Sequence, residues 1–147
     1  MAVSKGPLNW TTTIAPAKTA GECVDLLVKH GATHVTQMFE NRQPTGLAFV
    51  VVTKWGPRQY ILMVNVDGIH GVLKQAWRDS KIPASRATRE QAERTGWRVT
   101  KDWLEAQLAL VAAGAAELER IMLPWMSDDG RTLYEIIDEN QMRAIES

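Results

Sequence analysis

The chain has 147 residues, of which 45% are hydrophobic and 23% are charged, and its 17 basic and 17 acidic residues give a formal net charge of zero. This length fits one ordinary domain, and the composition is close to that of globular proteins, which argues against wholesale disorder. The single cysteine, Cys23, excludes an intrachain disulfide framework and a multi-cysteine zinc site.

The beginning of the chain predicts a strand and then a helix. Residues Trp10 to Ile14 are β-branched or aromatic and indicate a strand that Pro16 ends. The segment from Thr19 to Glu22 matches a capping box, which opens a helix, and Gly31 is a natural stop for that helix. Cys23 falls near the start of this helix, where a thiolate is favoured, but no base accompanies it and we interpret it as packing.

Three strands follow, joined by short loops. They cover Thr33 to Phe39, Leu47 to Thr53, and Gln59 to Val66, with turn residues at Asn41 to Gly46 and at Trp55 to Arg58. Short connections predict an antiparallel meander, which the first strand joins through the crossover helix. The middle strand is almost unbroken in its apolar character, so we expect both of its faces to be covered.

The second half of the chain predicts helices. A capping box at Thr88 opens a long helix that extends to about Gly114, and its last half is apolar nearly all round. Such a segment is central in a fold or forms a subunit interface. The remaining expected elements are a short helix at Ile69 to Asp79, a loop at Ser80 to Ala87, a helix at Ala115 to Met122, and a final capped helix from Thr132 to about Ala144.

Together these elements predict an α+β fold. We expect a four-stranded, mostly antiparallel sheet with one crossover helix, followed by a helical C-terminal half packed on it. The chain is expected to form a single domain over residues 1–147, in which residues 1–79 contain the sheet and residues 88–147 are helical.

The charges are unevenly placed along the chain. Residues 74–101 carry eight Lys/Arg against three Asp/Glu, a net of +5, whereas residues 102–147 carry three against ten, a net of −7. The two regions can neutralise each other, within a protomer or between protomers. Alternatively, the basic middle of the chain forms an anion site.

Basic and aromatic residues interleave in this basic region, which makes it the candidate ligand or anion site. Arginine forks bind phosphate, and a tryptophan face stacks on a base for about 1–3 kcal/mol. The alternative interpretation is that Trp97 and Trp103 belong to the core and that the arginines form a solvated face. The candidate residues are Trp77, Arg78, Arg86, Arg89, Arg94, Trp97, Arg98 and Lys101.

No catalytic motif is visible in the sequence. The three histidines, His30, His34 and His70, have no spacing typical of metal ligands. Neither a GxSxG motif nor a glycine-rich phosphate loop is present. We therefore expect a protein that is not an enzyme, with no catalytic residues, no metal and no cofactor.

One block of the sequence resembles a family of small phage and prophage proteins without a characterised activity. The resemblance implies an accessory role in the host cytoplasm and supplies no catalytic residues. Upstream, Gly31 to Thr33 and, after a strand, Gly46 to Phe49 are similar as well. The matching pieces are Glu90–Ala92, Trp97–Arg98, Lys101–Leu110, Ala113–Gly114, Leu123–Met126 and Asp129–Glu135.

The leading hypothesis is a non-enzymatic phage accessory protein that acts by binding. It would inhibit host defence, either by sequestering a nucleotide-type ligand or by blocking a host protein. One alternative is a single-stranded nucleic-acid-binding protein of phage replication or recombination, and another is a structural, self-associating protein. The apolar half of the long helix and the segment Leu123 to Met126 favour a homo-oligomer. The apolar runs are too short to cross a bilayer, so no membrane partner is expected.

Overall fold

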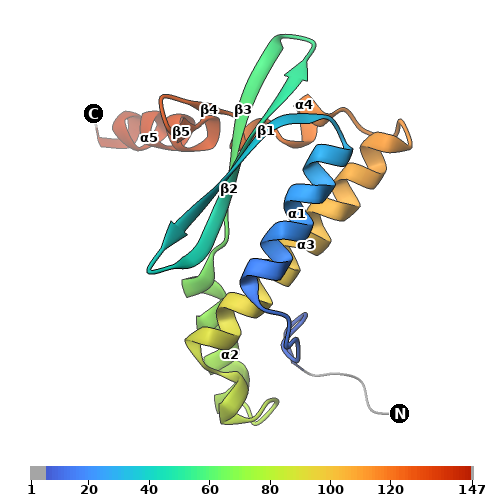
Figure 1. The fold of residues 1–147 in the computed structure, drawn as a ribbon. Helices are drawn as coiled ribbons and strands as arrows, with labels where there is room; N and C mark the ends of the chain where they lie inside the picture. The colour runs from blue at the N-terminus through green and yellow to red at the C-terminus, as the bar shows by residue number, and fades with distance from the viewer. Residues whose placement is uncertain (1–5, 147) are drawn as a thin grey trace.

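The computed structural model describes residues 6–146, which form an α+β arrangement of a small sheet and several helices (Figure 1). The main sheet has three antiparallel strands in the order β1-β2-β3. They cover Ala32–Glu40 (β1), Gln43–Thr53 (β2) and Gly56–Met63 (β3). A separate two-stranded ribbon pairs Ser127–Asp128 (β4) with Arg131–Thr132 (β5). The α+β class is thus confirmed.

The expected four-stranded sheet is wrong, because the segment from Trp10 to Ile14 is not a strand. The carbonyl oxygens of Trp10 and Thr12 accept hydrogen bonds from the side chain of Gln91. A β-branched run is only a weak preference for extended structure, and here side-chain partners take the place of a neighbouring strand.

Tight turns set the register of the three strands. Asn41 and Arg42 both have positive φ, 51° and 67°, as the commonest two-residue hairpin turn requires. The first turn is therefore shorter than the sequence indicates, and β2 begins at Gln43. Phe49 lies opposite Tyr60 across β2 and β3, and their rings stack with centroids 5.5 Å apart.

The first helix, α1, covers Pro16–Lys29 and starts earlier than expected. Proline is favoured in the first turn because its fixed φ suits a helix and its missing N–H is not needed there. Thr19 is consequently not a cap but a buried residue within the helix, and its hydroxyl has no hydrogen-bond partner among residues 6–146. The predicted stop is confirmed, since Gly31 has a φ of 102°.

The second and third helices are α2, Val66–Arg78, and α3, Arg89–Ala112, with a short 3₁₀ turn at Ala84–Arg86 between them. The predicted cap of the long helix is confirmed, because the Thr88 hydroxyl oxygen accepts a hydrogen bond of 3.2 Å from the backbone N–H of Gln91. This cap fixes where the helix begins.

The C-terminal region contains α4, Leu118–Ile121, a 3₁₀ turn at Leu123–Trp125, and the last helix α5, Leu133–Glu146. The Thr132 hydroxyl oxygen accepts from the backbone N–H of Glu135 at 3.2 Å, as its predicted capping role requires. Figure 1 shows the sheet between the α1–α3 pair on one side and α5 on the other. Within residues 6–146 no helix is long and apolar enough to cross a membrane.

The main core lies between one face of the sheet, called here the inner face, and helices α1 and α3. A smaller cluster between α2 and α3 contains Leu73, Ala76, Ile82 and Ala92. The expected apolar half of α3 is only partly buried, because Leu110 is exposed. The buried side chains of the main core include Cys23, Leu27, Leu47, Phe49, Tyr60, Leu62, Trp97, Leu104, Leu108 and Met122.

Candidate functional site

Two of the predicted anion-binding arginines are bonded to one buried glutamine. The side-chain oxygen of Gln91, a fully buried residue, accepts from Arg86 at 3.0 Å and from two nitrogens of Arg94 at 2.9 and 3.2 Å. The Gln91 amide nitrogen donates to the carbonyls of Trp10 and Thr12 at 3.0 and 2.9 Å. Arg86 and Arg94 therefore help to attach the N-terminal segment to α3.

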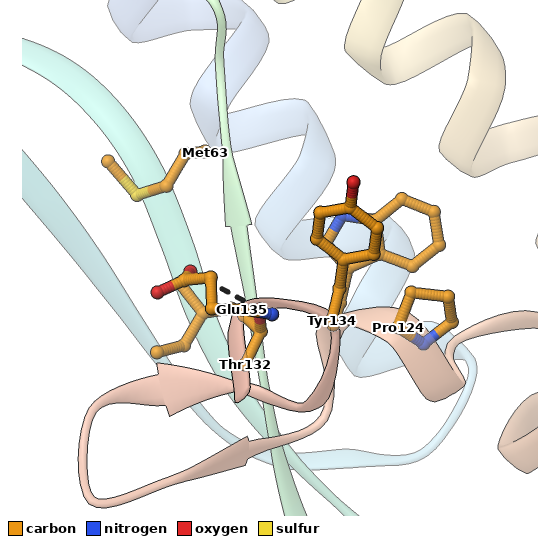
Figure 2. A pocket seen from close by; sticks show the side chains of 7 residues that line it. Met63, Pro124, Thr132, Tyr134 and Glu135 are labelled. Carbon is orange, nitrogen blue, oxygen red and sulfur yellow. Dashed lines mark hydrogen bonds between the residues drawn. The ribbon is translucent and has the colours of Figure 1, made fainter. Parts of the chain in front are cut away.

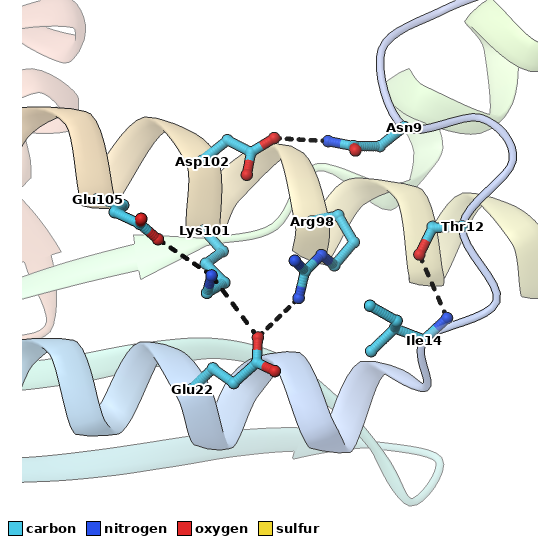
Figure 3. A network of polar contacts seen from close by, with 8 residues as sticks. All are labelled: Asn9, Thr12, Ile14, Glu22, Arg98, Lys101, Asp102 and Glu105. Carbon is cyan, nitrogen blue, oxygen red and sulfur yellow. Dashed lines mark hydrogen bonds and ion pairs between the residues drawn. The ribbon is translucent and has the colours of Figure 1, made fainter.

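Arg98 and Lys101 connect α3 to α1 (Figure 3). The Arg98 guanidinium lies 2.6 Å from a carboxylate oxygen of Glu22, and the Lys101 ammonium lies 3.8 Å from the same oxygen. Lys101 also pairs with Glu105 at 3.0 Å. Both basic side chains are largely covered, so their charges are already neutralised inside the fold.

Trp97 belongs to the core. Its side chain is only 1% exposed, and its indole N–H donates to the carbonyl of Pro44 at 2.9 Å. Stacking on a base requires an accessible ring face, which this tryptophan does not offer. The structure thus agrees with the alternative interpretation, which places Trp97 in the core.

The other three predicted residues lie elsewhere on the surface. The Arg89 guanidinium pairs with Asp67 at 2.7 Å, and this hydrogen bond raises the pKa of Arg89 and lowers that of Asp67. Trp77 and Arg78 lie at the end of α2, where Trp77 is 49% exposed and Arg78 donates to Gln75. The eight residues of the predicted site are therefore divided among five places. Spacing along a helix could not reveal this, because the partners of Arg89, Trp97 and Arg98 are distant in the sequence.

Cys23 is a core residue, as the sequence analysis proposed. Burial raises the pKa of its thiol to about 12, which keeps the thiol protonated near neutral pH. The charges that influence it belong to α1 and α3 and include no histidine. Among residues 6–146 no three His, Cys, Asp or Glu side chains are grouped to hold a metal ion.

A pocket of about 490 Å³ opens between β3 and the start of α5 (Figure 2). Most of its wall is apolar, and the Glu135 carboxylate, which accepts a hydrogen bond from the Thr132 hydroxyl, is its only charged group. Trp125 lies against Trp103, with ring centroids 4.9 Å apart, which holds that wall in place. The lining residues are Ile61, Met63, Pro124, Trp125, Thr132, Tyr134 and Glu135.

The pocket continues into the face of the sheet that points away from α1 and α3. Side chains alternate along a strand, so the residues between the core positions of β2 and β3 form this face. We define the outer sheet face as the β2 and β3 part of this side, which consists of Gly46, Ala48, Val50, Val52, Pro57, Gln59, Ile61 and Met63; His34, Thr36 and Met38 of β1 lie beside it on the same side. It contains no charged side chain, and Val52 and Met63 are 64% and 56% exposed. Antiparallel sheets usually present polar residues on a solvated face, so this face lacks its ordinary composition.

Helix α5, called here the C-terminal arm, has no buried residue along its 14 positions. Tyr134, Ile137, Met142 and Ile145 are all exposed, and the last of them is 77% exposed. Their spacing places them along one side of the helix. Neither the outer sheet face nor the arm was proposed as a site from the sequence. The available signals were the apolar character of β2 at successive positions and the apolar spacing of the arm.

Searches against protein-family models, curated proteins and solved structures find no match to this chain.

Proposed function

We propose that this chain is a non-catalytic accessory protein of phage type that acts in the host cytoplasm by binding another protein. The docking surface is the outer sheet face together with the C-terminal arm. The observation that carries the proposal is the partly exposed apolar face of β2 and β3, where Val52 and Met63 are 64% and 56% exposed and no side chain is charged. Contiguous exposed apolar surface of this kind is typical of protein interaction sites.

The placement of the basic residues supports protein binding over nucleotide sequestration. Arg98 and Lys101 pair with Glu22, and Arg86 and Arg94 pair with Gln91. An anionic ligand at these residues would have to replace partners that join α3 to α1 and to the N-terminal segment. The pocket beside β3 offers a carboxylate and apolar walls, which do not favour an anion.

Site-specific photo-crosslinking tests the proposal in the cells that make the protein. A benzophenone amino acid placed at Val52 should give crosslinks to protein, and mass spectrometry of the joined peptides should identify the partner. The matched control is Val72, which lies on α2 and is 51% exposed. If position 52 gives no more crosslinked protein than position 72, the proposal is rejected.

Single-stranded nucleic-acid binding is a second candidate, which the exposed end of α2 favours. Trp77 lies there with Arg78, and together with Lys81 it lines a shallow hollow. Stacking on Trp77 would be strengthened by the nearby positive charges. Trp77→Ala should weaken a gel shift of an oligonucleotide at low salt, whereas Trp55→Ala, which removes an equally exposed tryptophan on the β2–β3 turn, should not. Equal shifts for both variants, or none for the unchanged protein, would dismiss this candidate.

A further inference from the structure

The outer sheet face and the C-terminal arm both present exposed apolar side chains, and each surface could cover the other. We propose that the C-terminal arm of one copy lies on the outer sheet face of a second copy, which returns its own arm in the same way. This inference rests on the proposed function and names the partner as another copy of the chain. A twofold exchange of this kind buries both surfaces in each protomer.

The arm needs a partner because of its length and its composition. Isolated helices shorter than about 12–15 residues are marginal in water, and α5 has 14 residues of which none is buried. Tyr134, Ile137 and Ile145 follow one another at spacings of three and eight, which places them on one side. That side of the arm is suited to an apolar surface.

The outer sheet face is shaped to receive such a helix. Its middle consists of Gly46 and Ala48, which contribute little or no side chain and are buried beneath their neighbours. Met38 and Met63 border this middle, since a Cβ added at Gly46 would lie 2.6 Å from the Met63 sulfur and 3.2 Å from the Met38 methyl. Methionine side chains are flexible and adapt readily to an incoming apolar group.

The position of the arm favours a second copy over closure on its own sheet. In Figure 1 the arm leaves the body beside β3 and extends away from it, on the side opposite α1 and α3. Its first residues already line the pocket with Ile61 and Met63. The arm therefore begins at the edge of the outer sheet face but runs outward, away from its own sheet.

Charge complementarity supports the same partner. The arm carries four carboxylates and one arginine, a net of −3. The outer sheet face has no carboxylate, and Arg42 lies near one of its ends, at the β1–β2 turn. Arg42 forms no ion pair within residues 6–146. An acidic helix is thus attracted to this face and meets no like charge on it.

The area is sufficient for a specific dimer. Six exposed apolar side chains contribute to the contact in each protomer. Burying one such side chain is worth at least about 1.5 kcal/mol, which at about 25 cal/mol per Å² corresponds to about 60 Å² of apolar surface. Two protomers then hide about 700 Å² of apolar surface, which corresponds to roughly 1,200 Å² in total because interfaces are about 60% apolar. This is the lower end of the range for specific interfaces. The six are Val52, Met63, Tyr134, Ile137, Met142 and Ile145.

Mass measurement in solution provides the first test. Light scattering on the eluting protein should give twice the chain mass of 16.4 kDa. Val52→Glu and Ile145→Glu should each weaken association at least tenfold and give the single-chain mass, whereas the control Val72→Glu should remain dimeric. Ile145 is 77% exposed near the end of a helix, so Ile145→Glu leaves the core intact. This variant therefore tests the dimer even if Val52→Glu misfolds. A single-chain mass for the unchanged protein at about 100 μM, well above micromolar dissociation constants, overturns the inference.

Mixing the two variants provides the second test. The Val52→Glu chain keeps a competent arm and the Ile145→Glu chain keeps a competent sheet face, so a mixed dimer has one intact contact. Association should therefore return in part when the two are combined. If mixing restores nothing while each variant stays folded by circular dichroism, the arm does not pass between chains and the inference fails.

The proposed function and this inference fail in different ways. A crosslink from position 52 to a different protein, together with a single-chain mass, overturns arm exchange and leaves protein binding in place. A crosslink from position 52 to a peptide of the arm in another copy supports both.

Discussion

The polar contacts of Gln91 join the N-terminal segment to α3, and they lead to a quantitative prediction for Gln91→Leu. Leucine keeps a similar volume but removes every hydrogen bond of the side chain. The amide nitrogen donates to the carbonyls of Trp10 and Thr12, and the amide oxygen accepts from Arg86 and Arg94. A neutral hydrogen bond contributes about 1 kcal/mol and one to a charged group about 2 kcal/mol. Water reaches the two half-buried arginines and offsets part of the loss, so we expect a destabilisation of about 3–4 kcal/mol.

Urea unfolding followed by circular dichroism measures this loss. The midpoint should fall while the slope stays constant, and the melting temperature should drop by roughly 10 °C, given about 2–4 °C per kcal/mol at this chain length. Gln107→Leu is the control, because Gln107 lies on the same helix and its side chain makes no hydrogen bond within residues 6–146. Gln91→Glu keeps the acceptor for the arginines but loses the hydrogen bonds that the amide nitrogen donates to the two carbonyls. Its stability should therefore lie between that of the unchanged protein and that of Gln91→Leu. If Gln91→Leu and Gln107→Leu agree within about 1 kcal/mol, the reasoning is refuted.

Three further predictions concern buried positions. Burial raises the pKa of Cys23 from 9.0 to about 12, so above pH 9 the unfolded thiol ionises while the folded one does not. The free energy of unfolding should then fall by roughly 1.4 kcal/mol per pH unit over this window. Urea unfolding at about pH 8 and pH 10.5 measures this fall, and Cys23→Ala should lack the part of it that the thiol causes. Gly96→Ala should destabilise by about 1–2 kcal/mol in thermal melts despite its better helix propensity, because its Cβ would lie 2.8 Å from a methyl of Val64. Thr19→Val should raise the melting temperature slightly, since it removes a buried hydroxyl without a partner; a lower value would contradict the assigned environment.

Local signals predicted those features of the fold whose causes are local. The Thr88 cap and the Gly31 stop are confirmed because each depends on backbone groups a few residues away. The strand predicted at Trp10 to Ile14 was wrong because the partner of this segment, Gln91, lies about 80 residues further along the chain. No propensity within a short window reports such a contact.

The candidate site was predictable to a smaller degree, because charge and aromatic content do not determine pairing. Arg98 and its partner Glu22 are 76 residues apart, and only the packing of α1 on α3 brings them together. The apolar character of the middle strand was a better signal than the basic residues. It predicted cover on both faces, whereas within one chain only the inner face is covered by α1 and α3.

The long separation between Trp97 and its acceptor Pro44 has a consequence for the order of synthesis. The three strands can pair as soon as they are made, but the inner face with Leu47 and Phe49 lacks Trp97 until that residue has been added. At roughly 5–20 residues per second, the interval between β2 and Trp97 lasts several seconds. During that interval the inner face has only α1 to pack against, and the outer sheet face is also exposed. Protection by a chaperone is therefore most needed before α3 is complete.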